Sequence, residues 1–174
     1  AIIVAAGRGT RAGGGLPKQW RDLAGKPAIA HTLAAFAGMR RILVIHPDDR
    51  PHAEGLDAEL VHGGETRSAS VLAALRALEG SGVTRVLIHD AARPFVPADT
   101  IDRLLAALDH APGAVPVLPV ADTLAQGGAA LGDVVPRASL VRVQTPQAFA
   151  VSAIRDAHAA WDASAEATDD AQMV

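Results

Sequence analysis

The chain has 174 residues, 49% of them hydrophobic and 20% charged, which predicts one globular domain rather than a disordered chain. Sixteen Lys and Arg against 19 Asp and Glu give a net charge of -3, which excludes a general nucleic-acid binder because no positive field could hold a polyanion. The lack of cysteine excludes disulfide scaffolds and thiolate chemistry and fits a cytoplasmic location. No apolar run approaches the roughly 18 residues that span a bilayer, so we expect a soluble protein with no membrane partner.

Short apolar runs alternate with amphipathic stretches from residue 1 to about residue 118. The runs that predict buried strands are rich in aliphatic residues and lie at 1–6, 41–46, 85–89 and 113–118. Apolar residues at helical spacing predict helices over 27–37, over 68–78 and from Pro97 onward. The alternation is typical of βαβ units, so we expect an α/β fold with a largely parallel sheet and helices on both faces.

The alternation ends after Leu118. Residues 120–138 hold three glycines and a proline between short apolar pieces, which predicts an excursion from the sheet. Residues 140–143 then predict a returning strand, and residues 146–161 predict a helix. Thr168 is expected to cap a further helix near the end of the sequence.

Glycines and cations follow the first predicted strand, within residues 5–19. In an open α/β sheet, ligands bind at the carboxyl ends of the strands. Glycine lets backbone N–H groups approach phosphate oxygens closely, and Arg11 and Lys18 supply cations at the same place. We therefore expect a nucleoside triphosphate to bind here. A flexible surface loop is the plainer alternative.

The same glycines also match the dinucleotide-binding pattern G-x-G-x-x-A through Gly7, Gly9 and Ala12. That pattern requires a helix to begin within the glycines, and residues 13–17, Gly-Gly-Gly-Leu-Pro, prevent one. A Walker-type loop is also absent, since Lys18 follows a proline. The segment therefore favours a nucleotide-phosphate site over a dinucleotide site.

Two further segments are expected to end at the same edge of the sheet. Asp90 and Arg93 follow a predicted strand, where a carboxylate could hold Mg²⁺ against a polyphosphate and an arginine could reach an anionic second substrate. A simple ion pair between them is the plainer alternative. Residues 63–70 offer hydroxyls and backbone amides before a predicted helix, where the plainer alternative is a helix cap by Thr66 or Ser68.

Two other kinds of site find no support in the sequence. The seven histidines include no H-x-x-x-H pair, and there is no cysteine to complete a zinc set. No G-x-S-x-G elbow precedes a helix, so a serine hydrolase is not expected. The three strand ends instead converge on phosphate chemistry.

Taken in order, these motifs resemble the 2-C-methyl-D-erythritol 4-phosphate cytidylyltransferase family. The resemblance extends from residue 1 to about residue 171, and the segments that carry it are 5–11, 17–19, 63–70, 89–94, 122–123 and 145–147. The glycine motif alone is shared by many nucleotidyltransferases, whereas the complete series is far more specific.

The resemblance implies a Rossmann-like α/β nucleotidyltransferase that joins CTP to methylerythritol phosphate and releases pyrophosphate. It implies that Arg11 and Lys18 are the catalytic cations and that Asp90 binds Mg²⁺ or another divalent cation. The residues expected to contact CTP are Ala5, Ala6, Gly7, Gly9, Gly64, Glu65, Ser70 and Ala91. The residues expected to contact the sugar-alcohol phosphate are Arg93, Thr123, Arg137 and Thr145. The family often has aspartate where this chain has Glu65.

The resemblance also implies a homodimer. Residues 120–138 would form a protruding dimerisation arm, with Thr123 and Arg137 reaching the substrate of the neighbouring subunit. The family carries a further lysine, in a Lys-x-Thr segment, that would follow Val174. We therefore expect residues 1–174 to be one cytidylyltransferase domain without its C-terminal segment, from a longer chain that in some bacteria includes the cyclodiphosphate synthase of the pathway.

Two alternatives stay open at this stage. A ribitol 5-phosphate cytidylyltransferase has the same glycine loop and a similar aspartate–arginine segment, although the Ala91-Ala92 pair and residues 145–147 favour methylerythritol phosphate. A nonenzymatic CTP-binding module would bind CTP and Mg²⁺ without releasing pyrophosphate. The presence of both Arg11 and Lys18 argues against such a module, which needs neither cation at the α-phosphorus.

Overall fold

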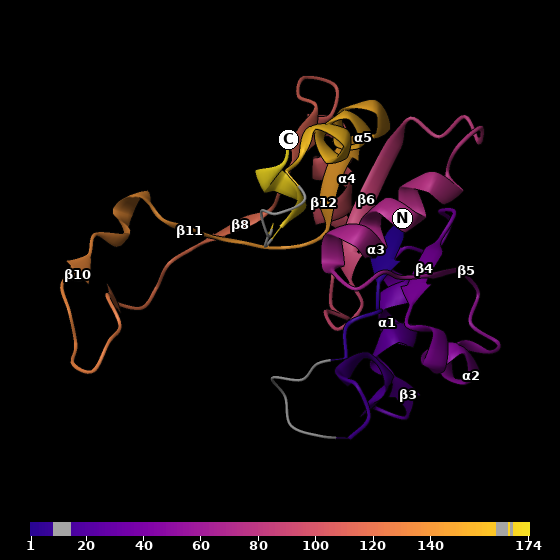
Figure 1. Cartoon of the computed structure of the whole chain (residues 1–174), viewed down its shortest axis with the longest axis horizontal. Coiled ribbons are helices and arrows are strands. Elements are labelled where there is room, and N and C mark those ends of the chain that lie inside the picture. Colours follow the sequence, from indigo (N-terminus) through magenta and orange to yellow (C-terminus); the bar gives the residue numbers. More distant parts are fainter. Residues whose placement is uncertain (9–14, 163–166, 168) are drawn as a thin grey trace.

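The computed structural model describes residues 1–8, 15–162, 167 and 169–174. It shows a layered α/β body from which one long arm projects (Figure 1). The predicted α/β fold with a mostly parallel sheet is confirmed.

A six-stranded sheet forms the middle layer, in the order β5-β4-β1-β6-β12-β7. Its strands are β1 (Ile2–Val4), β4 (Ile42–Ile45), β5 (Glu59–His62), β6 (Arg85–Asp90), β7 (Gly113–Ala114) and β12 (Gln147–Ala150). The first four strands in this order run parallel, whereas β12 is antiparallel to both of its neighbours. All four residues of β4 are buried, as expected for a central strand covered on both faces.

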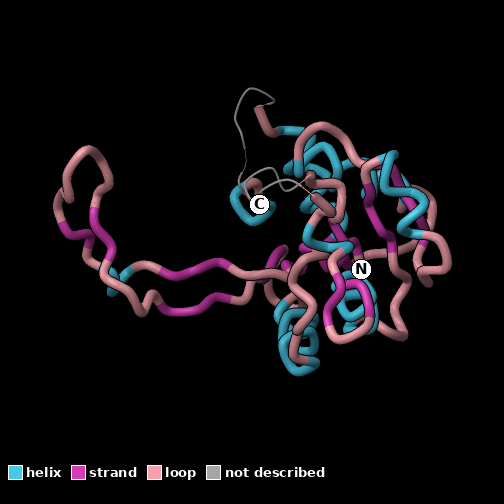
Figure 2. Tube along the Cα trace, turned by 90° about the horizontal axis from the view of Figure 1, so that it is seen from below, coloured by secondary structure: helices cyan, strands magenta, loops and turns pink. Residues whose placement is uncertain are grey.

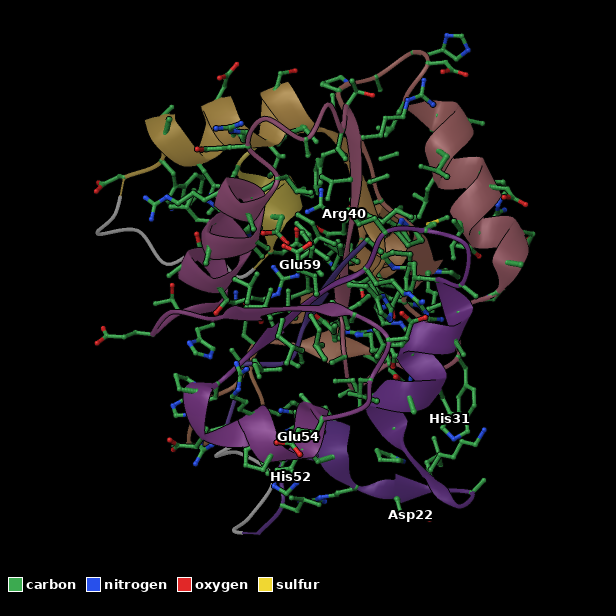
Figure 3. The ribbon with its side chains drawn as sticks, turned by 90° about the vertical axis from the view of Figure 1, so that its right-hand side faces the viewer. Asp22, His31, Arg40, His52, Glu54 and Glu59 are labelled. Atoms are coloured by element: carbon green, nitrogen blue, oxygen red, sulfur yellow. The ribbon has the colours of Figure 1, made fainter. Side chains whose placement is uncertain are left out.

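Helices cover both faces of this sheet (Figure 3). On one face lie α1 (Ala28–Ala35) and α4 (Ala98–Ala107), and on the other lie α3 (Arg67–Ala77) and α5 (Val151–Ala160). Successive residues of β1 point to opposite faces, so Ile3 packs in the first layer and Ile2 in the second. Within the described ranges, no helix has both the length and the apolar character needed to cross a membrane.

Short elements complete the body. They are the hairpin β2 (Asp22–Leu23) and β3 (Lys26–Pro27), the helix α2 (Arg50–Ala53), and the 3₁₀ turns η2 (Lys18–Trp20), η3 (Pro47–Asp49) and η5 (Asp170–Gln172). The predicted cap Thr168 lies outside the described residues. The N-cap of η5 is Asp169, whose carboxylate accepts a hydrogen bond from the Ala171 N–H (2.7 Å).

The arm is a two-stranded ribbon that runs away from the body (Figure 2). At its base β8 (Val117–Pro119) pairs with β11 (Val141–Val143), and farther out β9 (Leu124–Ala125) pairs with β10 (Val134–Val135), followed by the turn η4 (Arg137–Ser139). The excursion therefore begins before residue 120 and returns after residue 138.

The structure corrects three predicted elements. Residues 113–118 are not one strand, because β7 ends at Ala114 and β8 belongs to the arm; Pro116 between them has no N–H for a sheet. Residues 140–143 return within the arm, not in the main sheet. Residues 147–150 are a strand rather than the start of a helix, because they fill the slot between β6 and β7, where Phe149 is 1% exposed.

Candidate active site

A cleft of about 510 Å³ opens where β1 and β6 end and α3 begins. Ten of the predicted site residues line it, namely Ala5, Ala6, Gly7, Lys18, Gly64, Glu65, Ser70, Asp90, Ala91 and Arg93. Thr145 lies at its edge, where its Oγ1 accepts a hydrogen bond from the Asp90 N–H (3.4 Å). Three loops that are far apart in sequence therefore meet at the carboxyl edge of the sheet, as the motifs predict.

The other four predicted site residues fall into two pairs. Gly9 and Arg11 lie outside the described residues. Thr123 and Arg137 lie on the arm, where an Arg137 Nη1 donates to the Ala121 carbonyl. The chain does not bring these two arm residues to its own cleft.

The turn η2 places Lys18 at the cleft. Its backbone closes with a hydrogen bond from the Trp20 N–H to the Pro17 carbonyl (2.9 Å), and the Trp20 side chain anchors it in the core at 4% exposure. Lys18 is exposed and forms no ion pair within the described parts of the chain, whereas Arg8 is neutralised by Asp49 (3.2 Å). The charge of Lys18 is therefore available to an anionic ligand.

The neighbouring residue Gln19 connects this turn to the glycine loop. Its Nε2 donates to the carbonyl oxygens of Ala5 (2.7 Å) and Gly7 (3.2 Å), and the side chain is 5% exposed. In the sequence, Gln19 stands out only as part of a motif. Its buried amide group, which forms hydrogen bonds to two carbonyl oxygens of the loop, identifies it as part of the site.

The loop before α3 forms the second wall. Thr66 is the N-cap of α3, with its Oγ1 accepting from the Ala69 N–H (3.0 Å), so the plainer interpretation of Thr66 as a cap is confirmed. Ser70 accepts a bond from the Gly64 N–H (3.2 Å) and donates to the Thr66 carbonyl (2.9 Å). A Cβ at Gly64 would lie 2.6 Å from the Cβ of Ala69, so this close turn requires glycine.

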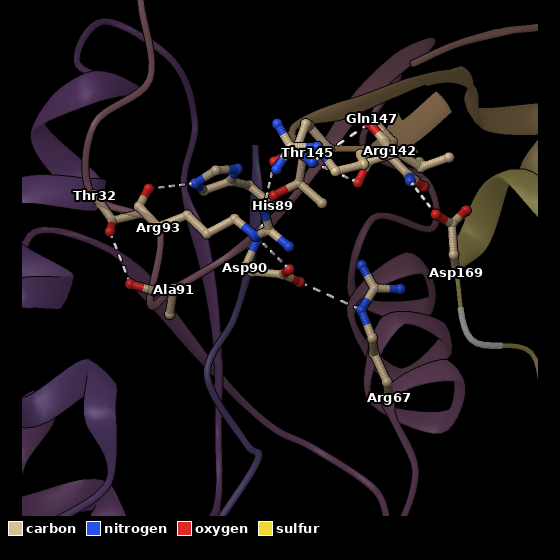
Figure 4. Close-up of polar contacts among 12 residues, drawn as sticks. Thr32, Arg67, His89, Asp90, Ala91, Arg93, Arg142, Thr145, Gln147 and Asp169 are labelled. Carbon is tan, nitrogen blue, oxygen red and sulfur yellow. Dashed lines mark hydrogen bonds and ion pairs between the residues drawn. The ribbon is translucent and has the colours of Figure 1, made fainter. Parts of the chain in front are cut away.

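Asp90 lies between two arginines (Figure 4). One carboxylate oxygen accepts from the Arg67 Nε (3.4 Å) and the other from the Arg93 Nε (3.1 Å). The ion pair of Asp90 with Arg93 is thus present, as the plainer alternative predicted. Arg67 extends it, although the sequence motif indicated no role for Arg67.

Arg67 also joins the cleft to the C-terminal segment. Its Nη1 lies 2.5 Å from the Oδ2 of Asp170, which is 1% exposed. Burial alone would lower the pKa of Arg67, but attraction to Asp170 and Asp90 outweighs burial and raises it. Arg67 therefore stays charged and is held from two sides.

The turn after β6 is fixed by a buried histidine. His89 is fully buried, and its Nε2 lies 2.8 Å from the Arg93 carbonyl, so this nitrogen carries the proton. Burial lowers the pKa of His89. The Arg93 guanidinium also donates to the Oε1 of Gln144 at the base of the arm (2.7 Å), a partner that no local pattern indicated.

The cleft offers few protein ligands for a metal ion. No group of three or more His, Cys, Asp or Glu side chains that could hold a metal occurs in the part of the chain that the structure describes. Asp90 fits as a single carboxylate ligand, because Mg²⁺ is usually held by one or two carboxylates, with water and substrate phosphates completing its shell.

The cleft is lined by the cations Lys18, Arg67 and Arg93 and lies at the carboxyl edge of a mostly parallel sheet, which is typical of an α/β protein of the nucleotidyltransferase class. The family model described as IspD, 2-C-methyl-D-erythritol 4-phosphate cytidylyltransferase, matches residues 1–174. The chain belongs to this family.

Individual relatives agree. The chain is 56% identical over 185 residues to 2-C-methyl-D-erythritol 4-phosphate cytidylyltransferase of Cereibacter sphaeroides, covering 99% of this chain and 81% of that protein. It is 56% identical over 179 residues to the bifunctional enzyme IspD/IspF of Rhodobacter capsulatus, covering 99% of this chain and 46% of that protein. The crystal structure of the cytidylyltransferase from Thermus thermophilus superposes with a TM-score of 0.83 at 39% identity, covering 99% of this chain and 81% of that one.

Proposed function

We propose that this chain transfers the cytidylyl group of CTP to 2-C-methyl-D-erythritol 4-phosphate and releases pyrophosphate. The observation that carries the proposal is the exposed Lys18, which has no carboxylate partner in the described part of the chain. Lys18 lines the cleft together with the C-terminal end of β1. Membership of the family supports the choice of both substrates.

The reaction is a displacement at phosphorus. An oxygen of the acceptor phosphate attacks the α-phosphorus of CTP, a new P–O bond forms, and the bond to the β-phosphate oxygen breaks so that pyrophosphate leaves. No general base is needed, because a phosphate monoester has its second pKa at about 6 and is already an anion at neutral pH. The protein must instead offset the repulsion between two anions, which is the task of preorganised cations and amide donors.

In the proposal Lys18 and Arg11 supply that charge, and the backbone of residues 6–9 supplies N–H groups, because the Ala5 N–H already donates to the Val44 carbonyl. The loop at Gly64, Glu65 and Ser70, together with Ala91, would hold the remainder of CTP. The acceptor phosphate would bind Arg93 and Thr145, both of which already form hydrogen bonds with the backbone of Asp90. Arg93 can exchange its bond to Asp90 for one to phosphate, because guanidinium groups bind both anions in the same geometry.

Asp90 is the proposed ligand for Mg²⁺ or another divalent cation. The ion would supply positive charge between the phosphate groups. Arg67 and Arg93 already bond to both oxygens of Asp90, so metal and arginines would compete for this carboxylate.

A second copy of the chain is the proposed partner of the arm. The ribbon leaves large apolar side chains open, with Leu131 85%, Val134 64% and Val141 54% exposed. A two-stranded ribbon has no core of its own, and an exposed apolar surface of this kind is typical of an interface. In the proposed homodimer, Thr123 and Arg137 would reach the acceptor in the partner's cleft.

The decisive experiment measures pyrophosphate release with CTP and Mg²⁺, offering methylerythritol phosphate and ribitol 5-phosphate in parallel. A C-terminally extended chain serves as the second sample. We expect release with methylerythritol phosphate alone. Release only with ribitol 5-phosphate would assign the other acceptor, and binding of CTP without release from either sample would support a nonenzymatic module.

A further inference from the structure

Gln19 occupies a position where the sheet's hydrogen bonding ends. The Ala5 N–H still donates to the Val44 carbonyl of β4 (2.7 Å), so the Ala5 carbonyl faces the same neighbour. β4 ends at Ile45, one residue before the next donor would be needed, and the chain turns away into η3. The side-chain amide of Gln19 takes the place of that missing donor at 2.7 Å.

The same amide group also binds the backbone two residues farther along, at Gly7. Its Nε2 reaches the Gly7 carbonyl at 3.2 Å, so one side chain fixes two alternate peptide groups. In a trans peptide the N–H points opposite to the carbonyl. The N–H groups of Ala6 and Arg8, which share peptide groups with these carbonyls, therefore point away from Gln19.

For Ala6, which lines the cleft, that direction leads into it. Consecutive residues of a strand address opposite neighbours, so Ala6 faces the side of β6, whose following turn forms the facing wall with Asp90 and Arg93. Neither the Ala6 nor the Arg8 N–H donates to an acceptor within the described stretches of the chain. Two backbone donors are thus directed and left open.

We propose that Gln19 is a positioning residue that aims the Ala6 and Arg8 N–H groups at the triphosphate and fixes Lys18 beside them. The link to Lys18 is covalent, since the two residues are neighbours in one 3₁₀ turn whose Trp20 is anchored in the core. This inference rests on the proposed function for the identity of the anion. The inference goes beyond the proposed function because it assigns the alignment of the two backbone N–H groups and the Lys18 ammonium to one buried side chain.

The test replaces Gln19 by Met, which keeps the length of the side chain and removes both donors. Inorganic tripolyphosphate serves as the probe, because it tests the anion site without a base, an acceptor or turnover. We expect its dissociation constant to rise about tenfold, the size expected for the loss of two oriented hydrogen bonds. In ¹⁵N-labelled wild type the Ala6 and Arg8 amides shift on titration, and in the variant these two shifts are lost.

Trp20→Phe is the matched control, since it loosens the same turn while keeping both bonds of Gln19. If Gln19 only stabilises the fold, two variants whose melting temperatures fall equally should also bind tripolyphosphate equally weakly. That result overturns the proposal. Should Gln19→Met fail to fold, Gln19→Asn applies the same comparison, because its amide is one methylene too short to reach both carbonyls.

The outcomes separate this inference from the proposed function. If the wild type releases pyrophosphate but Gln19→Met binds tripolyphosphate as Trp20→Phe does, the proposed reaction stands and only the role of Gln19 is disproved. If the wild type releases no pyrophosphate but the tenfold difference in tripolyphosphate binding is observed, the proposed reaction is disproved. Gln19 is then still the residue that aligns an anion site.

Discussion

Arg67 and Asp170 are 103 positions apart in the chain and meet with 2.5 Å between Nη1 and Oδ2. Asp170 is almost fully buried, and burial raises the pKa of its carboxyl group while Arg67 opposes that shift. Through Arg67 the C-terminal segment is connected to Asp90, and therefore to the candidate active site. The segment after α5 thus contributes to the cleft as well as to the body.

Replacing Asp170 by Asn tests that connection. The amide keeps the size of the side chain but removes the nearer of the two charges that balance Arg67. We expect the free energy of unfolding to fall by about 2 kcal/mol, because a largely buried ion pair is broken and only the more distant Asp90 remains as a partner. Urea unfolding at pH 7.5 measures the change. The control is Glu79→Gln, which breaks the exposed pair with Arg155 and should cost less than about 0.5 kcal/mol. Equal effects of the two substitutions would contradict a special role for the buried pair.

Lys18→Ala tests the proposed catalytic cation. Removing one charge-stabilising donor from a phosphoryl-type transition state typically costs on the order of 10²-fold or more in turnover, and we expect that loss in kcat for pyrophosphate release. Lys26→Ala is the matched control, because Lys26 is an exposed lysine on β3 and does not line the cleft. A Lys18→Ala enzyme that keeps most of its rate would remove Lys18 from the catalytic set.

Gly63, like Gly64, lies in a position before α3 that has no room for a side chain. A Cβ at Gly63 would lie 2.5 Å from the Cβ of Ala6 and 2.7 Å from the Oγ of Ser70, both of which line the cleft. We therefore expect Gly63→Ala to cost about 2 kcal/mol of stability by overpacking and to raise the KM for CTP by displacing Ala6. Thermal unfolding and initial rates measure the two effects. Gly127→Ala on the arm meets nothing within 4 Å and should change neither.

Two histidines, the buried His89 and the partly buried His158, predict a loss of stability in mild acid. Burial lowers the pKa values of His89 and His158 below 6.5, the ordinary value, which both regain in the unfolded chain. As the pH falls below 6.5, the unfolded chain therefore takes up protons that the folded chain does not, and the free energy of unfolding decreases. Urea unfolding at pH 7.5, 6.5 and 5.5 measures the slope. His158→Asn should flatten it.

The sequence predicted those parts of the molecule whose cause is local. The β4 segment Ile-Leu-Val-Ile is apolar throughout because both of its faces are covered, and Lys18 could be placed because it follows a strand and a glycine loop. Residues 147–150 could not be predicted as a strand, since Gln-Ala-Phe-Ala has no strand pattern and only the slot between β6 and β7 makes it extended. The pairing of Arg67 with Asp170 likewise has no local signal, because only the complete fold brings them together.

The proposed contribution of Arg137 to the partner's cleft makes a quantitative prediction for mixed dimers. Lys18→Ala and Arg137→Ala homodimers should both be nearly inactive, each lacking one cation at every site. In a mixed dimer, the site with an intact Lys18 would receive the intact Arg137 of the other subunit. Random exchange of equal amounts of two inactive variants should therefore restore about a quarter of the wild-type rate in a two-fold symmetric dimer. If Arg137 served the cleft of its own chain, each site of the mixed dimer would still lack one of the two residues, and no activity would return.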